Sequence, residues 1–110
     1  MSPLARMEMR TEGGAIVATV VGEVDISNAA DLGSALEGAV PQRALGLVLD
    51  LSDATYIDSA GIGLFARFRF RCAASGLHLQ AILPGGMTGH ALRIVRIFEG
   101  FEVHVEHAVA

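Results

Sequence analysis

Two continuous apolar runs, each the length of one β-strand, constrain the fold of this chain more than any other feature. They are residues Ala15–Val21 and Leu45–Leu51, the second interrupted only by Gly46 and Asp50, and Leu77–Leu83 is expected to form a further strand. Continuous runs of this kind are typical of strands buried on both faces of a parallel sheet. Segments of helical periodicity separate them, as the crossovers between parallel strands require. The order predicts a single α/β domain over residues 1–110, with a mixed, mostly parallel sheet of about five strands and helices packed on it.

Two further strands complete the expected sheet. Leu4–Thr11 alternates weakly between apolar and polar residues, which favours an edge strand, and Gly13–Gly14 predicts a turn into the next strand. Gly22 is expected to end that second strand. Near the C-terminus, a loop at Pro84–Gly86 precedes Val103–Val105, which favours a last strand.

Three segments have the residue spacing of helices. The first follows Ser27 or Asn28, either of which can cap it, and Pro41 stops it. The second extends from Ser59 to Gly76, and a short third helix is expected over His90–Phe98. The predicted order of elements is therefore β-β-α-β-α-β-α-β.

The second of these helices contains an alternation, Arg67–Arg71, that on its own has the period of a strand. A helix is favoured because the segment is long and begins at a serine that can cap it. Its apolar stripe is then expected to comprise Ile62, Phe65, Ala66 and Ala73. In that arrangement Arg69 falls on the stripe, whereas Leu64 and Phe68 point away from it. These two residues form either an exposed interaction patch or a contact with a neighbouring helix.

Composition excludes several classes of function. The formal net charge of −4 disfavours a nucleic-acid partner. All eight basic residues are arginines, so the lysine of a phosphate-loop NTPase and the amine of a Schiff-base enzyme are both missing. A single cysteine, Cys72, fits a reducing compartment. No apolar run is long enough to span a bilayer, and no secretory signal is visible. A cytoplasmic location is expected.

The chemically informative segment surrounds Ser59. A buried strand leads through a predicted loop, Ser52–Asp58, to a serine at the start of a helix. Ser59 is interpreted in two compatible ways, as a helix N-cap and as a site of phosphorylation. Gly61 and Gly63 leave little side chain around the first turn, so a partner protein could approach the backbone there.

Two blocks of sequence resemble the STAS domain, and within it the bacterial anti-sigma factor antagonists. Gly22–Ile26, followed by Asn28–Leu32, is similar to the end of a family strand and the first family helix. Leu49–Leu51, continuing through Ile57–Gly63, is similar to the family's phosphoacceptor segment, with Ser59 in the place of the phosphorylated serine.

The resemblance implies a small regulator that is not an enzyme and needs no cofactor. Its unphosphorylated form is expected to bind an anti-sigma factor, often itself an ATP-dependent serine kinase, and so to release a sigma factor. Phosphorylation of Ser59 would break that complex, and a serine phosphatase would restore it. The implied partner surface comprises Asp25, Asp58, Ser59, Ala60, Gly61, Ile62, Gly63 and Leu64.

Two alternatives remain open from the sequence, and a third is disfavoured. The chain could be a STAS subunit of a lipid-transporter or stressosome-type assembly. Ser59 could be a catalytic nucleophile, although the Gly-x-Ser-x-Gly elbow of hydrolases is missing. A metal site is disfavoured: Asp50 and Asp53 are better explained by turn hydrogen bonds, and His104 and His107 would face opposite sides of a strand.

Overall fold

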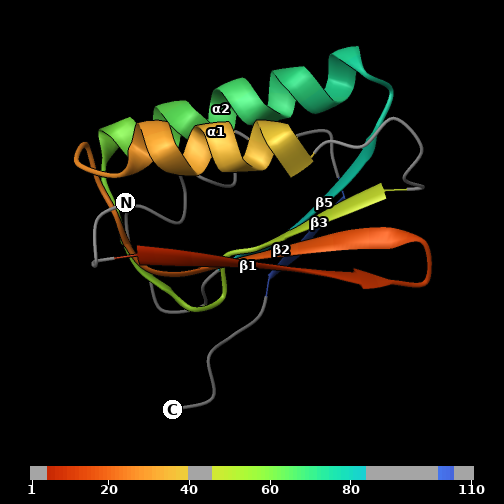
Figure 1. Ribbon diagram of the computed structural model, residues 1–110, viewed down its shortest axis with the longest axis horizontal. Coiled ribbons are helices and arrows are strands. Elements are labelled where there is room, and N and C mark those ends of the chain that lie inside the picture. Colours follow the sequence, from red (N-terminus) through yellow and green to blue (C-terminus); the bar gives the residue numbers. More distant parts are fainter. Residues whose placement is uncertain (1–4, 40–45, 84–101, 106–110) are drawn as a thin grey trace.

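One mixed sheet forms the base of the molecule, and both described helices lie on the same face of it (Figure 1). The computed structural model describes residues 5–39, 46–83 and 102–105. The strands are β1 (Ala5–Glu12), β2 (Ala15–Val24), β3 (Gly46–Asp50), β4 (Ala54–Ile57), β5 (His78–Leu83) and β6 (Glu102–Val105). The helices are α1 (Ala29–Ala39) and α2 (Ser59–Ala74). Neither helix is long and apolar enough to cross a membrane.

The sheet has the predicted mixed and mostly parallel topology. Its main path is β1-β2-β3-β5-β6, and β4 pairs with β2 beside that path. Only the β1–β2 pair is antiparallel among the pairings that the structure describes. Gly13 and Gly14 join these two strands with φ angles of 56° and 83°. Two consecutive positive φ angles are the requirement of a tight two-residue hairpin, which explains the glycine pair.

Strand β2 continues past the point where the sequence predicted its end. Gly22 has a φ of 100°, and the register with β4 shifts between Gly22 and Glu23, so the glycine makes an irregularity within the strand. Residues before it pair with β3, whereas Gly22 to Val24 pair with β4. Strand β4 itself was predicted as loop. It is only four residues long and has exposed residues at its centre, so it lacks the apolar run that identifies a buried strand.

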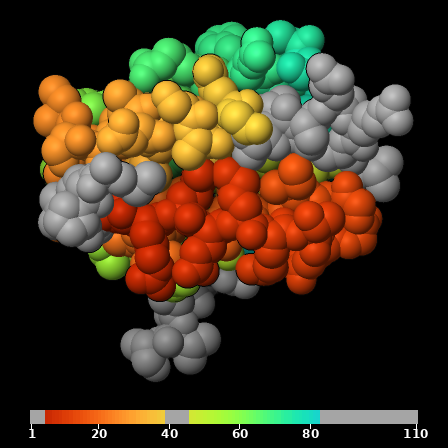
Figure 2. Space-filling model, viewed as in Figure 1, coloured from red at the N-terminus to blue at the C-terminus, as the bar shows by residue number. Residues whose placement is uncertain are grey.

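The core lies between the sheet and the two helices. Side chains from β2, β3 and β5 that face the helices are almost fully buried, as are Leu32 and Leu36 of α1. Figure 2 shows α1 between α2 and the β1–β2 hairpin, so α1 packs on both the sheet and its neighbouring helix. This arrangement confirms the first helix, which was predicted from the spacing of its apolar residues.

The apolar stripe of α2 differs from the predicted one. The Arg-Phe alternation is helical, as expected, but the buried positions are Gly61, Leu64, Phe65, Phe68 and Cys72. The idea of an exposed patch at Leu64 and Phe68 is therefore wrong, and their burial against α1 is the correct alternative. The stripe is rotated because α2 packs against α1 as well as against the sheet. Phe70, two positions after Phe68, is 71% exposed.

Three of the expected features fall outside the described residues. These are the stop at Pro41, the loop at Pro84–Gly86 and the short helix over His90–Phe98. The predicted last strand is confirmed as β6, which pairs in parallel with β5.

Candidate functional site

Asp58, rather than Ser59, caps helix α2. Its backbone is extended (φ −89°, ψ −172°), and its carboxylate accepts a hydrogen bond from the Gly61 N–H at 3.1 Å. Its carbonyl accepts the first helical hydrogen bond, from the Ile62 N–H at 2.9 Å. The interpretation of Ser59 as the cap is therefore wrong. Aspartate caps about as well as serine, and here it occupies the residue before the helix.

Ser59 is the first residue of α2 and is exposed to solvent. Within the part of the chain that the structure describes, its hydroxyl makes no hydrogen bond. Because Asp58 supplies the cap, the Ser59 hydroxyl has no structural task in this helix end. It is available to an enzyme or to a partner protein.

A rigid turn, Asp25–Asn28, follows strand β2. The Asp25 carboxylate accepts hydrogen bonds from the backbone N–H and the hydroxyl of Ser27. The buried Asn28 amide accepts from the Asp25 N–H at 3.0 Å and donates to the Glu23 carbonyl at 2.8 Å. Asn28 stands directly before α1, but its side chain holds this turn rather than capping the helix. The expected cap by Ser27 or Asn28 is therefore corrected.

The turn and the start of α2 are fixed against each other by the pairing of β2 with β4. Val24 and Ile57 are register partners, and the Asp58 N–H donates to the Val24 carbonyl at 3.1 Å. Gly61 packs on both side chains: a Cβ at this position would lie 2.7 Å from Ile57 Cγ2 and 2.9 Å from Val24 Cγ1. Asp25 and Asp58 each follow one of the paired residues, so the sheet brings them to the same edge.

The structure separates the predicted partner-binding residues into two groups. Asp25, Asp58, Ala60, Ile62 and Gly63 are partly exposed, and Ser59 is exposed. Gly61 and Leu64 are buried. The second group supports the site from within and cannot present side-chain surface to a partner.

Two exposed apolar residues at this edge were missed in the sequence. Ile26 is 83% exposed on the Asp25–Asn28 turn, and Tyr56 is 42% exposed in β4. A signal for Ile26 was present, because an Asp-x-Ser turn closed by side-chain hydrogen bonds leaves its middle residue on the outside. Tyr56 gave no such signal, since β4 itself was not recognised.

Other candidates for chemistry have structural explanations. The Asp50 carboxylate accepts hydrogen bonds from the Ser52 N–H at 3.0 Å and from its hydroxyl at 2.6 Å, as the sequence predicted for a turn.

No group of three or more potential metal ligands occurs among the described residues. Cys72 is buried in the core, and this burial raises the pKa of its thiol to about 11, opposed by the nearby charge of Arg71. His107 lies outside the described residues.

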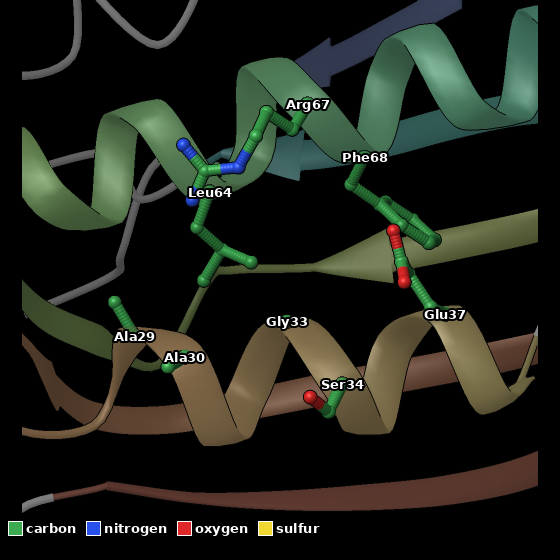
Figure 3. Close-up of a pocket in the computed structure, with 8 residues that line it drawn as sticks. All are labelled: Ala29, Ala30, Gly33, Ser34, Glu37, Leu64, Arg67 and Phe68. Carbon is green, nitrogen blue, oxygen red and sulfur yellow. The ribbon is translucent and has the colours of Figure 1, made fainter.

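A cavity of about 180 Å³ lies between α1 and α2 (Figure 3). Four small residues of α1 and Glu37 form one wall, and three larger side chains of α2 form the other. The lining residues are Ala29, Ala30, Gly33, Ser34, Glu37, Leu64, Arg67 and Phe68. The helices approach closely, because a Cβ on Gly33 would lie 2.8 Å from Leu64 Cδ1.

Residues 7–99 match a family model described as "Mlab, STAS domain". No curated protein matches the sequence.

The fold is similar to several solved structures. An anti-sigma factor antagonist from Mycobacterium paratuberculosis is 21% identical with a TM-score of 0.78, over 94% of this chain and 88% of that one. A putative anti-sigma factor antagonist from Thermotoga maritima is 16% identical with a TM-score of 0.68, over 89% of this chain and 85% of that one. The Bacillus cell fate determinant SpoIIAA, in its phosphorylated form, is 15% identical with a TM-score of 0.67, over 92% and 91% of the respective chains.

Proposed function

The chain belongs to the STAS domain family, and on that premise we propose that it is an anti-sigma factor antagonist switched by phosphorylation of Ser59. In its unphosphorylated form it binds an anti-sigma factor, which releases a sigma factor for transcription. The anti-sigma factor, acting as a serine kinase, transfers the γ-phosphoryl group of ATP to the Ser59 hydroxyl, with loss of the hydroxyl proton and formation of ADP. A serine phosphatase hydrolyses the phosphoserine and restores binding. The protein is not an enzyme, holds no cofactor and acts in the cytoplasm.

The observation that carries this proposal is that the helix cap and the exposed hydroxyl belong to different residues, Asp58 and Ser59. Asp58 caps α2, so the exposed Ser59 hydroxyl can change its chemical state without loss of the cap. A phosphoryl group there adds about 1.5 to 2 negative charges beside the positive end of the helix dipole, where anions are tolerated. The fold is therefore expected to survive phosphorylation while the surface around Ser59 changes its charge.

The surroundings of Ser59 also suit an interface that a phosphate can disrupt. Ala60, Ile62 and Gly63 are partly exposed and mostly small, so a partner backbone can come close to this turn. The exposed Ile26 and Tyr56 add apolar area at the same edge. A phosphate on Ser59 would bring a hydrated dianion into a surface built for close contact, and desolvating it would cost binding free energy.

The proposal is tested with Ser59→Ala and Ser59→Asp as baits for the anti-sigma factor in a native cytosol. Since neither substitution touches the cap, we expect both variants to fold. The Ala bait should retain an ATPase-fold anti-sigma factor, and the Asp bait should lose it. Ser75→Asp is the charge control, because it places the same charge at the other end of α2. The helix dipole disfavours a negative charge there, so the folding of this variant is checked by circular dichroism. Retention of the same partners by both Ser59 baits would contradict the switch.

One alternative function is kept because the description of the matching family model names no sigma-factor regulator. The chain could be an accessory STAS subunit of a lipid-transporter or stressosome-type assembly. The same experiment separates the two functions. Recovery of a transporter ATPase or of large scaffold proteins on all baits would favour the assembly subunit.

A further inference from the structure

The side chain of Arg67 extends backwards along α2 toward the start of the helix. Its Nη1 lies 3.4 Å from the position that a Cβ of Gly63 would occupy, one turn before Arg67 itself. Figure 3 shows the guanidinium folded back over Leu64, in the direction of the N-terminal end of α2. Gly63 leaves room for the guanidinium, because side chains that extend beyond a Cβ at that position would stand in its path.

Arg67 has no acidic partner among the described residues. Arg6 pairs with Glu8 and Arg10 pairs with Glu12, both on β1 and neither involving Arg67. Glu37 lines the same cavity from α1, yet it makes no ion pair with Arg67. The guanidinium is exposed at the mouth of the cavity, so its charge and its five N–H donors are free to bind an anion.

Ser59, Gly63 and Arg67 succeed one another at intervals of four residues on α2. Residues four apart are neighbours on one side of a helix, and each such step rises about 6 Å along the axis. The guanidinium already lies level with Gly63, so about one turn separates it from Ser59. Helical side chains tilt toward the N-terminus, so the Arg67 side chain points toward Ser59 and has to close this interval to reach a phosphoryl group there. The three phosphate oxygens match the planar fork of an arginine.

We propose that Arg67 is the intramolecular ligand of phosphorylated Ser59, reached across the gap that Gly63 leaves in the side of α2. The proposal rests on Ser59 being the phosphorylated residue. The contact holds the guanidinium over Gly63, along the surface of the first two turns, with its tip toward the phosphate. It thereby covers the backbone that a partner would otherwise approach, and it explains why one face of α2 combines a serine, a glycine and an unpaired arginine.

The test measures the second pKa of the phosphate by ³¹P NMR titration. Phosphoserine is inserted at residue 59 during translation, so neither a kinase nor a partner is needed. Three proteins are compared: the natural sequence, Arg67→Gln and Arg71→Gln. Arg71 is the matched control, because it is an exposed arginine on the same helix that lies one turn farther from Ser59. The acids at the start of α2, on the turn after β2 and in the first turn of α1, which are Asp58, Asp25 and Asp31, are the same in all three proteins.

An arginine in contact with the phosphate stabilises its dianion and lowers its second pKa, which is ordinarily about 6. We expect Arg67→Gln to raise that pKa by at least roughly 0.3 units relative to the natural sequence, after allowance for solvent screening. Arg71→Gln should leave it nearly unchanged. Equal titration of all three proteins, or equal shifts in both variants, would overturn the proposal.

Failure of this inference can be told apart from failure of the proposed function. The titration reports the contact whether or not any partner responds to phosphorylation. If Arg67→Gln shifts the second pKa of the phosphate but phosphorylation of Ser59 does not change partner binding, the contact exists and the switch does not. If phosphorylation weakens partner binding but Arg67→Gln leaves the second pKa of the phosphate unchanged, the switch stands and Arg67 has no part in it.

Discussion

Replacement of Gly61 by alanine should destabilise the fold, whereas the same change at Gly63 should not. At Gly61 the new Cβ would lie 2.7 Å from Ile57 Cγ2 and 2.9 Å from Val24 Cγ1. Both neighbours are β-branched and fully buried, so neither can move aside easily. At Gly63 the nearest atom would be Arg67 Nη1 at 3.4 Å, the far end of an exposed and flexible side chain.

The magnitude follows from two opposing effects. Alanine in place of glycine favours a helix interior by up to about 1 kcal/mol, and both substitutions gain this. Overpacking a tight core costs typically about 1–3 kcal/mol, and only Gly61→Ala incurs it. The propensity effect largely cancels in the comparison, so Gly61→Ala should have a free energy of unfolding roughly 1–3 kcal/mol below that of Gly63→Ala.

Thermal and urea unfolding followed by circular dichroism measure this difference. For a domain of this size, each kcal/mol corresponds to a shift of roughly 4 °C or more in melting temperature. Gly38→Ala is a second reference, because a Cβ there meets nothing within 4 Å. If Gly61→Ala melts at or above the temperature of Gly63→Ala, the close packing of α2 on β2 and β4 is refuted.

Three further predictions concern the core, the turn and the thiol. Phe68→Ala should lower the free energy of unfolding by about 3–5 kcal/mol, because Phe68 is buried against α1, whereas Phe70→Ala should change it by less than about 0.5 kcal/mol. Urea denaturation would show this contrast, and equal losses would contradict the orientation of α2. Asn28→Ala should cost about 1–3 kcal/mol, since it removes two hydrogen bonds and leaves backbone groups unsatisfied in the turn before α1. A melting temperature unchanged from the natural protein would show that this amide is dispensable. Cys72 should react with a thiol reagent at pH 8 only after unfolding, because its side chain is buried and the pKa of its thiol is raised to about 11. Rapid labelling of the folded protein would contradict that burial.

The sequence predicted the architecture wherever a segment has one dominant apolar pattern. The two apolar runs and the predicted strand Leu77–Leu83 correspond to β2, β3 and β5, and the Gly13–Gly14 turn was recognised because few residue pairs adopt two positive φ angles. Strand β4 was missed because its two central residues are exposed. Its place is set by pairing with the end of β2 after Gly22, which is a long-range property.

The errors at α2 have a related cause. The prediction assumed that the apolar stripe of the helix starting at Ser59 faces one neighbour, but α2 contacts both α1 and the sheet. Leu64 and Phe68 therefore became core residues. The cap was assigned to Ser59 because serine is a favoured cap, although Asp58 is equally suited and stands one residue earlier. The sequence did not predict that Gly61 packs on Val24 and Ile57. The approach of a partner to the backbone of this turn stays a prediction.

The most direct test of the switch uses the purified protein with phosphoserine at residue 59 and the cognate anti-sigma factor. Isothermal titration calorimetry would compare its Kd with those of the unphosphorylated protein and of Ser59→Ala. The switch predicts that phosphorylation weakens binding at least about tenfold, or 1.4 kcal/mol, while Ser59→Ala binds like the unphosphorylated protein. Equal affinity of the phosphorylated and unphosphorylated forms would contradict the account.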